Sequence, residues 1–150
     1  MLYEVSGIQK KGTKMKKNNE KKVVVVDDDE SIRKTFFLLL HENYKVYPAK
    51  DSDEALKRFQ GEDIDLIIAD MRLPQHSGLQ MLEKFRDSGY KGKAILISAF
   101  PDLVNPKELN QAAVDCFFVK PLELEALTQS IEYLLGHSRG SGEYSVKKQR

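Results

Sequence analysis

The sequence predicts an α/β domain with a doubly wound parallel sheet of five strands and helices on both faces. Short apolar segments alternate five times with segments of helical composition, which is typical of parallel strands joined by right-handed crossovers. Several apolar segments are continuous instead of alternating, as expected for strands that are buried on both faces. The length of 150 residues suits one domain of this kind.

The predicted strands are short and end at polar residues. Lys22–Val26 is a β-branched run that stops at a cluster of carboxylates, and Asp65–Ala69 is an apolar run that ends at Asp70. Tyr44–Tyr47 alternates like a short strand. The last two predicted strands are Lys93–Ile97, which ends at Ser98, and Cys116–Val119, which ends at Lys120-Pro121.

Helical segments follow the strands. The first spans Glu30–His41, and the second spans Ser52–Phe59 with Asp51 or Ser52 as its N-cap. Apolar residues at helical spacing predict a third helix over Leu79–Arg86. The remaining segments are an irregular stretch over 99–104, a helix that opens at Asn105-Pro106, and a helix over Leu124–Leu135 that stops at Gly136.

We expect one folded domain over residues 22–136. Residues 1–21 lack apolar periodicity and are predicted to form a disordered basic arm, in which Met15 is an alternative start. Residues 137–150 have a linker-like composition, which predicts either a flexible C-terminal tail or the start of an interdomain linker.

Charge is distributed unevenly along the chain, although the net charge is only +1. Residues 1–22 hold seven lysines and two glutamates, and residues 137–150 hold four basic residues and one acidic residue. Residues 23–136 therefore carry a net charge of −7, which disfavours direct nucleic-acid binding by the core. The basic ends are expected to be solvated tails, with contact to an acidic partner or nucleic acid as the alternative.

No apolar run approaches the roughly 20 residues of a membrane-spanning helix, and the N-terminus lacks a signal-peptide pattern. We therefore expect a cytoplasmic protein that does not enter the membrane. Cys116 has no second cysteine to pair with and is expected to be a small buried hydrophobic side chain. His41, His76 and His137 are scattered and are expected to lie on the surface.

Five polar residues follow predicted strands, so a parallel sheet brings them to one edge. In the flavodoxin-like order 2-1-3-4-5, ligands bind at this edge between the first and third strands, where Asp27, Asp28 and Asp70 are expected. Carboxylates gathered there favour a divalent cation with oxygen ligands, Mg²⁺ or alternatively Mn²⁺. The competing interpretation is that the acidic residues after the first strand only cap the first helix.

The same edge suits phosphoryl chemistry. A carboxylate can attack phosphorus and form an acyl phosphate if cations neutralise the phosphoryl oxygens, and Lys120 is the expected protein cation. Ser98 can donate a hydroxyl hydrogen bond to a phosphoryl oxygen, although a serine at this position is more often a cap or turn residue.

These residues carry a resemblance to the receiver domain of two-component response regulators over about residues 22–135. Five features occur in the family's order and spacing. They are Val26-Asp27-Asp28, Asp70 with Pro74 and Gly78 after it, Ser98-Ala99, an aromatic residue at 117, and Lys120-Pro121.

The resemblance implies roles for the matching residues. Asp70 is the expected phosphoacceptor and Lys120 the phosphate-contacting lysine, while Ser98 and Phe117 form the conformational switch, for which plain core packing of Phe117 is the alternative. The implied metal shell consists of Asp28 and Asp70 as direct ligands, Asp27 largely through water, and the backbone carbonyl of Arg72. The switched surface is expected around residues 99–127.

Two positions depart from the residue types that orient a hydrolytic water. Arg72 stands two residues after the expected acceptor and Phe100 two residues after Ser98, and neither side chain is a carboxylate or amide. We therefore expect slow autodephosphorylation and a long-lived phosphoryl group. Ala113 replaces a glycine that is common at the end of the fourth helix, so this helix is expected to be short or displaced.

The expected function is a phosphoacceptor signalling domain and not an enzyme. The implied partners are a histidine kinase or a histidine phosphotransfer protein upstream and a protein target or output domain downstream, with the chain a monomer or weak homodimer. It resembles single receivers of the chemotaxis and sporulation-relay kinds, and a fragment of a longer regulator is the alternative. A Mg²⁺-dependent phosphohydrolase and a binding scaffold remain as other classes.

Overall fold

A computed structural model of the chain describes residues 20–136 and the backbone of residues 147–149. The predicted arm is thus almost wholly outside the described residues, as are His137 and most of the predicted tail. The strands are β1 (Lys22–Val26), β2 (Lys45–Ala49), β3 (Leu66–Asp70), β4 (Lys93–Ser98), β5 (Cys116–Val119) and β6 (Lys147–Gln149). The helices are α1 (Glu30–Leu40), α2 (Ser52–Phe59), α3 (Gly78–Asp87), the 3-10 turn η3 (Pro101–Leu103), α4 (Pro106–Gln111) and α5 (Leu124–Leu135).

The strands form one parallel sheet in the order β2-β1-β3-β4-β5-β6. The predicted order 2-1-3-4-5 is confirmed. The residues of β1, β3 and β4 are almost all buried, because helices cover both faces of these strands.

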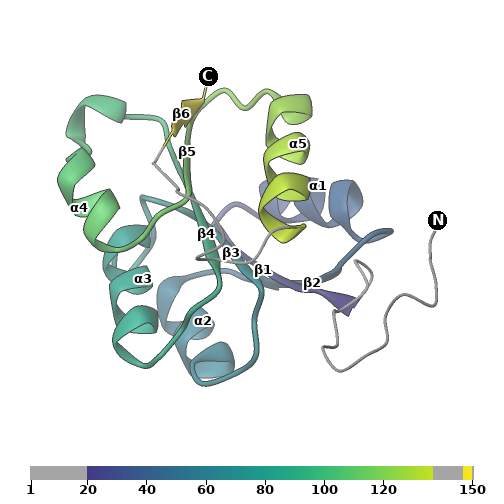
Figure 1. Ribbon diagram of the computed structural model, residues 1–150, viewed down its shortest axis with the longest axis horizontal. Helices are drawn as coiled ribbons and strands as arrows, with labels where there is room; N and C mark the ends of the chain where they lie inside the picture. Colours follow the sequence, from purple (N-terminus) through teal and green to yellow (C-terminus); the bar gives the residue numbers. More distant parts are fainter. Residues whose placement is uncertain (1–19, 137–146, 150) are drawn as a thin grey trace.

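Helices cover the two faces of the sheet in separate layers, as Figure 1 shows. The α1 and α5 helices pack on one face through a cluster that includes Phe36, Leu40 and Ile131. The α2, α3 and α4 helices pack on the other face, where Phe85 and Phe117 lie in the second cluster. Two hydrophobic cores therefore lie on the two faces of the sheet, and the loops at its carboxyl edge lie outside them.

The sixth strand differs from the five that the sequence predicts. β6 pairs in parallel with β5 in the register Cys116–Lys147 to Phe118–Gln149. Without β6 the outer edge of β5 would present unpaired backbone N–H and C=O groups, and a short segment of almost any composition can pair with such an edge. Residues 147–149 are Lys-Lys-Gln, without an apolar or β-branched residue, so sequence patterns do not predict this strand.

Most element boundaries agree with prediction within about two residues. β2 extends to Ala49 and includes Pro48, which an edge strand tolerates because its missing N–H needs no partner there. Asp51, not Ser52, caps α2 by accepting a hydrogen bond from the N–H of Glu54 at 2.8 Å. The fourth helix is short, as expected, and Ala113 follows it in the left-handed conformation at φ 58°.

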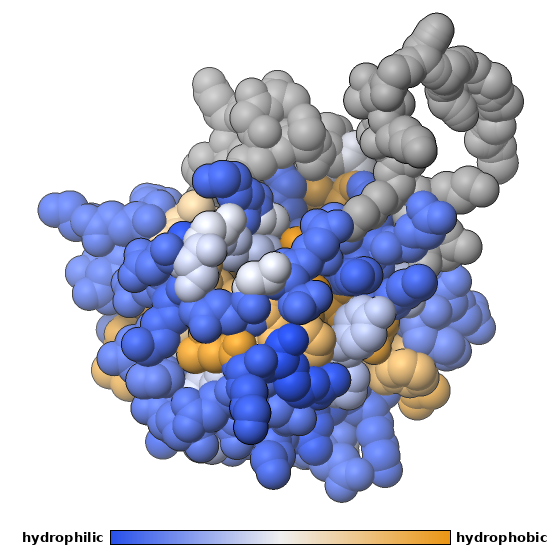
Figure 2. All heavy atoms as spheres, turned by 90° about the horizontal axis from the view of Figure 1, so that it is seen from below, coloured by the Kyte–Doolittle hydropathy of each residue, from blue (hydrophilic) through white to orange (hydrophobic). Residues whose placement is uncertain are grey.

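The surface is mainly polar. Figure 2 shows one face on which hydrophilic side chains surround small hydrophobic areas. Among the described residues, no helix is long and apolar enough to cross a membrane. The exposed large hydrophobic side chains are Phe37, Leu38, Phe100, Leu103, Leu124 and Tyr133.

The start of α3 lies directly against the end of β3. A Cβ atom added at Gly78 would lie 2.3 Å from the backbone oxygen of Asp70 and 3.2 Å from the Cα of Met71. The N–H of Gly78 donates to the carbonyl of Met71 at 3.0 Å. This close approach requires glycine, and it fixes where the polypeptide turns after Asp70.

We predict that Gly78→Ala lowers the free energy of unfolding by about 1–3 kcal/mol, because backbone atoms must move to admit the methyl group. Urea unfolding measures the loss, and amide chemical shifts of Asp70 and Met71 report the displacement. Gly61→Ala is the matched control, since its Cβ meets no atom within 4 Å and only its φ of 87° is strained. Unchanged shifts at Asp70 in the Gly78 variant would contradict this prediction.

Candidate functional site

The predicted polar residues converge at the carboxyl edge of the sheet. Asp27 follows β1, Asp70 ends β3 and Ser98 ends β4, while Lys120 follows β5. The Nζ atom of Lys120 lies 2.6 Å from Oδ2 of Asp70, across 50 residues of sequence. Parallel strands end at one edge, so the fold alone brings these charges together.

Asp70 is held at both carboxylate oxygens. Its Oδ2 accepts from Lys120, and its Oδ1 accepts a hydrogen bond from the backbone N–H of Arg72 at 2.8 Å. Only 7% of the residue is exposed. Each carboxylate oxygen has a second lone pair, so Asp70 can still accept a cation or attack an electrophile.

The three aspartates after β1 differ in burial and in hydrogen bonding. Asp29 is the N-cap of α1 and accepts from the backbone N–H of Ser31 at 2.9 Å. Asp27 is 3% exposed and accepts from the backbone N–H of Asp29 at 2.9 Å. Asp28 is exposed beside the loop that follows β3. Helix capping therefore falls to Asp29, and neither Asp27 nor Asp28 is needed as a cap.

Burial and repulsion perturb the titration of this cluster. Burial, with the neighbouring charges of Asp70 and Asp28, raises the pKa of Asp27 from 3.8 to about 6, against the opposing effects of the Asp29 N–H and Lys120. For Lys120, burial lowers the pKa, but the hydrogen bond to Asp70 and the charges of Asp70 and Asp27 outweigh it and raise the pKa overall. The cluster thus favours additional positive charge.

A divalent cation fits this donor set. The groups available are carboxylate and carbonyl oxygens, which hard cations such as Mg²⁺ prefer. The ion would offset both the burial of the Asp27 charge and its repulsion by Asp70 and Asp28, which together raise the pKa of Asp27. Among the described residues, no three His, Cys, Asp or Glu side chains are arranged to hold a metal by themselves. Such a site needs backbone and water oxygens to complete it, as is common for Mg²⁺.

Ser98 and Phe117 lie on neighbouring strands in the buried sheet. The Oγ atom of Ser98 accepts from the backbone N–H of Phe100 at 2.9 Å, and its residue is 2% exposed. Phe117 is buried in the core beside α3 and α4, in register with Leu96. Both residues occupy the positions that the sequence indicates, and the role of each as a switch remains a prediction.

Arg72 and Phe100 contact each other, although they come from different loops. The guanidinium carbon of Arg72 lies 5.1 Å from the centre of the Phe100 ring, which is a cation–π distance. Both side chains are exposed. Two residues that the sequence suggested only separately therefore act as one pair beside the site.

The residues expected to lie outside the site do so where the structure describes them. His41 is exposed and stacks on Phe37, and His76 is half-buried with its Nε2 atom 4.0 Å from Oδ1 of Asp53. Cys116 is buried, as expected. The serine at position 52, which sequence analysis considered only as a cap, is fully buried against the loop after β3.

A doubly wound α/β domain with an acidic pocket and a lysine at the carboxyl edge of its sheet defines a class of flavodoxin-like domains. Residues 23–132 match the family described as the response regulator receiver domain, and the chain belongs to this family. It is a receiver domain of two-component signalling.

Known proteins agree with this assignment. Response regulator RR06 of Streptococcus pneumoniae is 31% identical over 97 residues, which are 65% of this chain and 44% of the relative. The receiver domain protein of Methanospirillum hungatei superposes with a TM-score of 0.74 at 28% identity, over 81% of this chain and 98% of that one. The regulator TrrA of Thermotoga maritima, in complex with Mg²⁺ and BeF, gives a TM-score of 0.67 at 31% identity, over 77% and 99% of the two chains.

The chain spans only part of the curated proteins that it matches. It covers between 15% and 44% of the length of these relatives. The similarity therefore defines a receiver domain and leaves the activities of the longer proteins outside it.

We predict that the stability of the metal-free protein depends on pH through Asp27. A raised pKa means that the folded state binds the Asp27 proton more tightly than the unfolded chain does. Protonation of Asp27 therefore stabilises the folded state, fully below about pH 4, and this stabilisation is lost as the pH rises above about 6. The side-chain amide of Asp27→Asn cannot lose a proton. Between about pH 4 and above about pH 6, the free energy of unfolding of Asp27→Asn should therefore rise by about 1–3 kcal/mol relative to that of wild type. Urea unfolding in EDTA at several pH values measures it, and a constant difference would contradict it.

Proposed function

We propose that Asp70 accepts a phosphoryl group from a phosphohistidine donor. The observation that carries the proposal is the ion pair of 2.6 Å between Asp70 and Lys120 inside a pocket of further carboxylates. A nucleophilic carboxylate needs positive charge close by to neutralise the incoming phosphoryl oxygens. Lys120 supplies that charge where the phosphoryl group would arrive.

In the proposed transfer, a carboxylate oxygen of Asp70 attacks phosphorus while the P–N bond of the donor breaks. An acyl phosphate forms on Asp70, and the electron pair of the P–N bond stays on the donor imidazole, which takes up a proton from solvent and leaves as neutral histidine. The N–H of Arg72 keeps Asp70 oriented through its Oδ1 atom, and Lys120 moves its contact from the carboxylate to a phosphoryl oxygen.

Asp28, Asp70 and the backbone carbonyl of Arg72 would hold Mg²⁺ directly, with Asp27 acting largely through water. When bound, the ion supplies charge neutralisation of the phosphoryl oxygens. The Mg²⁺-BeF complex of TrrA supports magnesium in this role, and we extend the proposal to Mn²⁺, which accepts the same oxygen ligands.

The proposed switch couples this site to the surface of residues 99–127. Phosphorylation would draw the hydroxyl of Ser98 toward the phosphate, away from the N–H of Phe100 that it now accepts from. The space left behind would admit a rotated Phe117, and the loop and helix beyond β4 would repack. Two such packings give the bistable element that a phosphorylation switch requires.

We place this domain in the cytoplasm, with a histidine kinase or a histidine phosphotransfer protein as donor. Its output would be contact with a downstream protein target or an attached output domain, and the domain would act as a monomer or weak homodimer. It would not turn over a substrate beyond its own phosphorylation and slow autodephosphorylation.

We predict that wild-type protein incubated with Mg²⁺ and acetyl phosphate gains the mass of one phosphoryl group. Asp70→Asn should gain none, and EDTA should abolish the adduct in wild type, because both the nucleophile and the charge on the phosphoryl oxygens are required. Intact-mass spectrometry measures the adduct. Steady donor hydrolysis without an adduct would support a phosphohydrolase instead, and no reaction at all would support a binding scaffold.

We predict that Arg72→Gln shortens the lifetime of the phosphorylated protein by about tenfold, which is less than the contribution of a full general base. An amide oxygen can accept a hydrogen bond from a hydrolytic water, whereas a guanidinium and a phenyl ring, 5.1 Å apart here, offer no such acceptor. The decay of the adduct after removal of donor measures the lifetime. Arg58→Gln is the matched control, because it removes another arginine–phenylalanine contact, 4.6 Å over Phe59, away from the site. Rapid decay of wild type would overturn the expectation of a long-lived phosphoryl group.

A further inference from the structure

The loop after the proposed acceptor contains a strained turn. Gln75 has φ 69°, in the left-handed region that a residue other than glycine rarely adopts. The backbone N–H of His76 donates to the carbonyl of Pro74 at 2.9 Å, so residues 74–76 close a three-residue turn around Gln75. Such a conformation persists only where surrounding contacts hold it.

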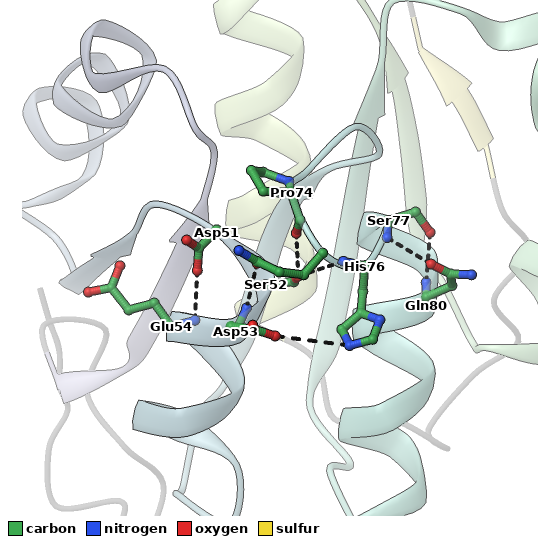
Figure 3. Close-up of polar contacts among 9 residues, drawn as sticks. Asp51, Ser52, Asp53, Glu54, Pro74, His76, Ser77 and Gln80 are labelled. Carbon is green, nitrogen blue, oxygen red and sulfur yellow. Dashed lines mark hydrogen bonds and ion pairs between the residues drawn. The ribbon is translucent and has the colours of Figure 1, made fainter.

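Ser52, from the first turn of α2, contacts both ends of this turn. Its Oγ atom donates to the carbonyl of Pro74 at 2.7 Å and accepts from the backbone N–H of His76 at 3.0 Å, as Figure 3 shows. The residue is 0% exposed, so no water competes for these hydrogen bonds. The backbone N–H of Asp53 donates to Oε1 of Gln75 at 3.2 Å, which ties the side chain of the turn to the same helix.

The other end of the loop is fastened to the proposed site. The N–H of Gly78 donates to the carbonyl of Met71 at 3.0 Å, and the N–H of Arg72 donates to Asp70 at 2.8 Å. The carbonyl of Arg72 therefore belongs to a short segment held by Asp70 on one side and by the Ser52-bound turn on the other. Movement of the turn would move this carbonyl.

We infer that Ser52 is a positioning residue for Mg²⁺, which acts by holding the loop that presents the carbonyl of Arg72. This inference rests on the proposed function, since it takes the metal shell from there. A group that orients a metal ligand without touching the metal contributes to affinity through preorganisation. Ser52 has this relation to Arg72, although Ser52 lies in α2 and Arg72 in the loop after β3, 20 residues later in the sequence.

The test is a Mg²⁺ titration of the unphosphorylated full chain, followed by the backbone amide signals of Met71 and Arg72 in NMR spectra. Ser52→Ala should raise the apparent dissociation constant about threefold to tenfold, as expected for the loss of one or two buried hydrogen bonds. Ser88→Ala is the matched control. Its hydroxyl accepts from the side-chain amide of Gln60 at 2.6 Å. Gln60 and Ser88 are the C-caps of α2 and α3, so this contact lies at the ends of the two helices away from the loop.

Urea unfolding of both variants measures the stability that each change costs, and Mg²⁺ affinity is compared at a pH and temperature where both variants are fully folded. Ser88→Ala removes an exposed hydrogen bond, so it is expected to cost less stability than Ser52→Ala and to keep its Mg²⁺ affinity within twofold of wild type. Equal weakening of Mg²⁺ binding in both variants would overturn the role of Ser52, and so would unchanged affinity in Ser52→Ala.

A measurement on wild type covers the case in which Ser52→Ala does not fold. If the turn at residues 74–76 helps Mg²⁺ to bind, then Mg²⁺ must stabilise the turn by the same factor. Hydrogen exchange of the His76 amide should therefore slow about threefold or more at saturating Mg²⁺, and unchanged exchange would overturn the inference. Absence of any Mg²⁺ binding by wild type would instead overturn the proposed metal site on which the inference rests.

Discussion

The ion pair between Lys120 and Asp70 is the interaction on which the rest of the site depends. Two further carboxylates, Asp27 and Asp28, lie at the same edge of the sheet. Burial, together with repulsion from Asp70 and Asp28, raises the pKa of Asp27 to about 6. Lys120 offsets part of this repulsion and no more. The folded domain is therefore left short of positive charge at one place, which is the electrostatic condition for binding a divalent cation or a phosphoryl group with its metal.

The loop between β3 and α3 converts this electrostatic condition into geometry. Gly78 allows the chain to turn back against Asp70, and Ser52 holds the far end of the loop in a conformation that Gln75 would not adopt alone. From the same loop, Arg72 contacts Phe100, which lies in the loop after β4. The helices α2 and α3 and the loops after β3 and β4 thus set the surroundings of the Asp70 carboxylate.

Sequence patterns predict the elements that are buried on both faces. β1, β3, β4 and β5 can be located because continuous apolar runs that end at polar residues are typical of central parallel strands. The signal is weaker at the edges of the sheet. The end of β2 was not predicted because Pro48 argues against a strand unless the strand lies at an edge, and β6 was not predicted because its pairing depends on β5 and not on its own residues.

By itself the sequence determined the fold class and the residues that meet at the carboxyl edge, because both follow from periodicity and from where each parallel strand ends. The strand order came from likeness to flavodoxin-like sheets, since other doubly wound orders share the same alternation of strands and helices. Only the tertiary structure decided how those residues interact. It assigned helix capping to Asp29, paired Arg72 with Phe100, and buried Ser52 against the loop after Asp70. Contacts of this kind join segments that share no local pattern, so they exist only once the sheet and its helices have packed.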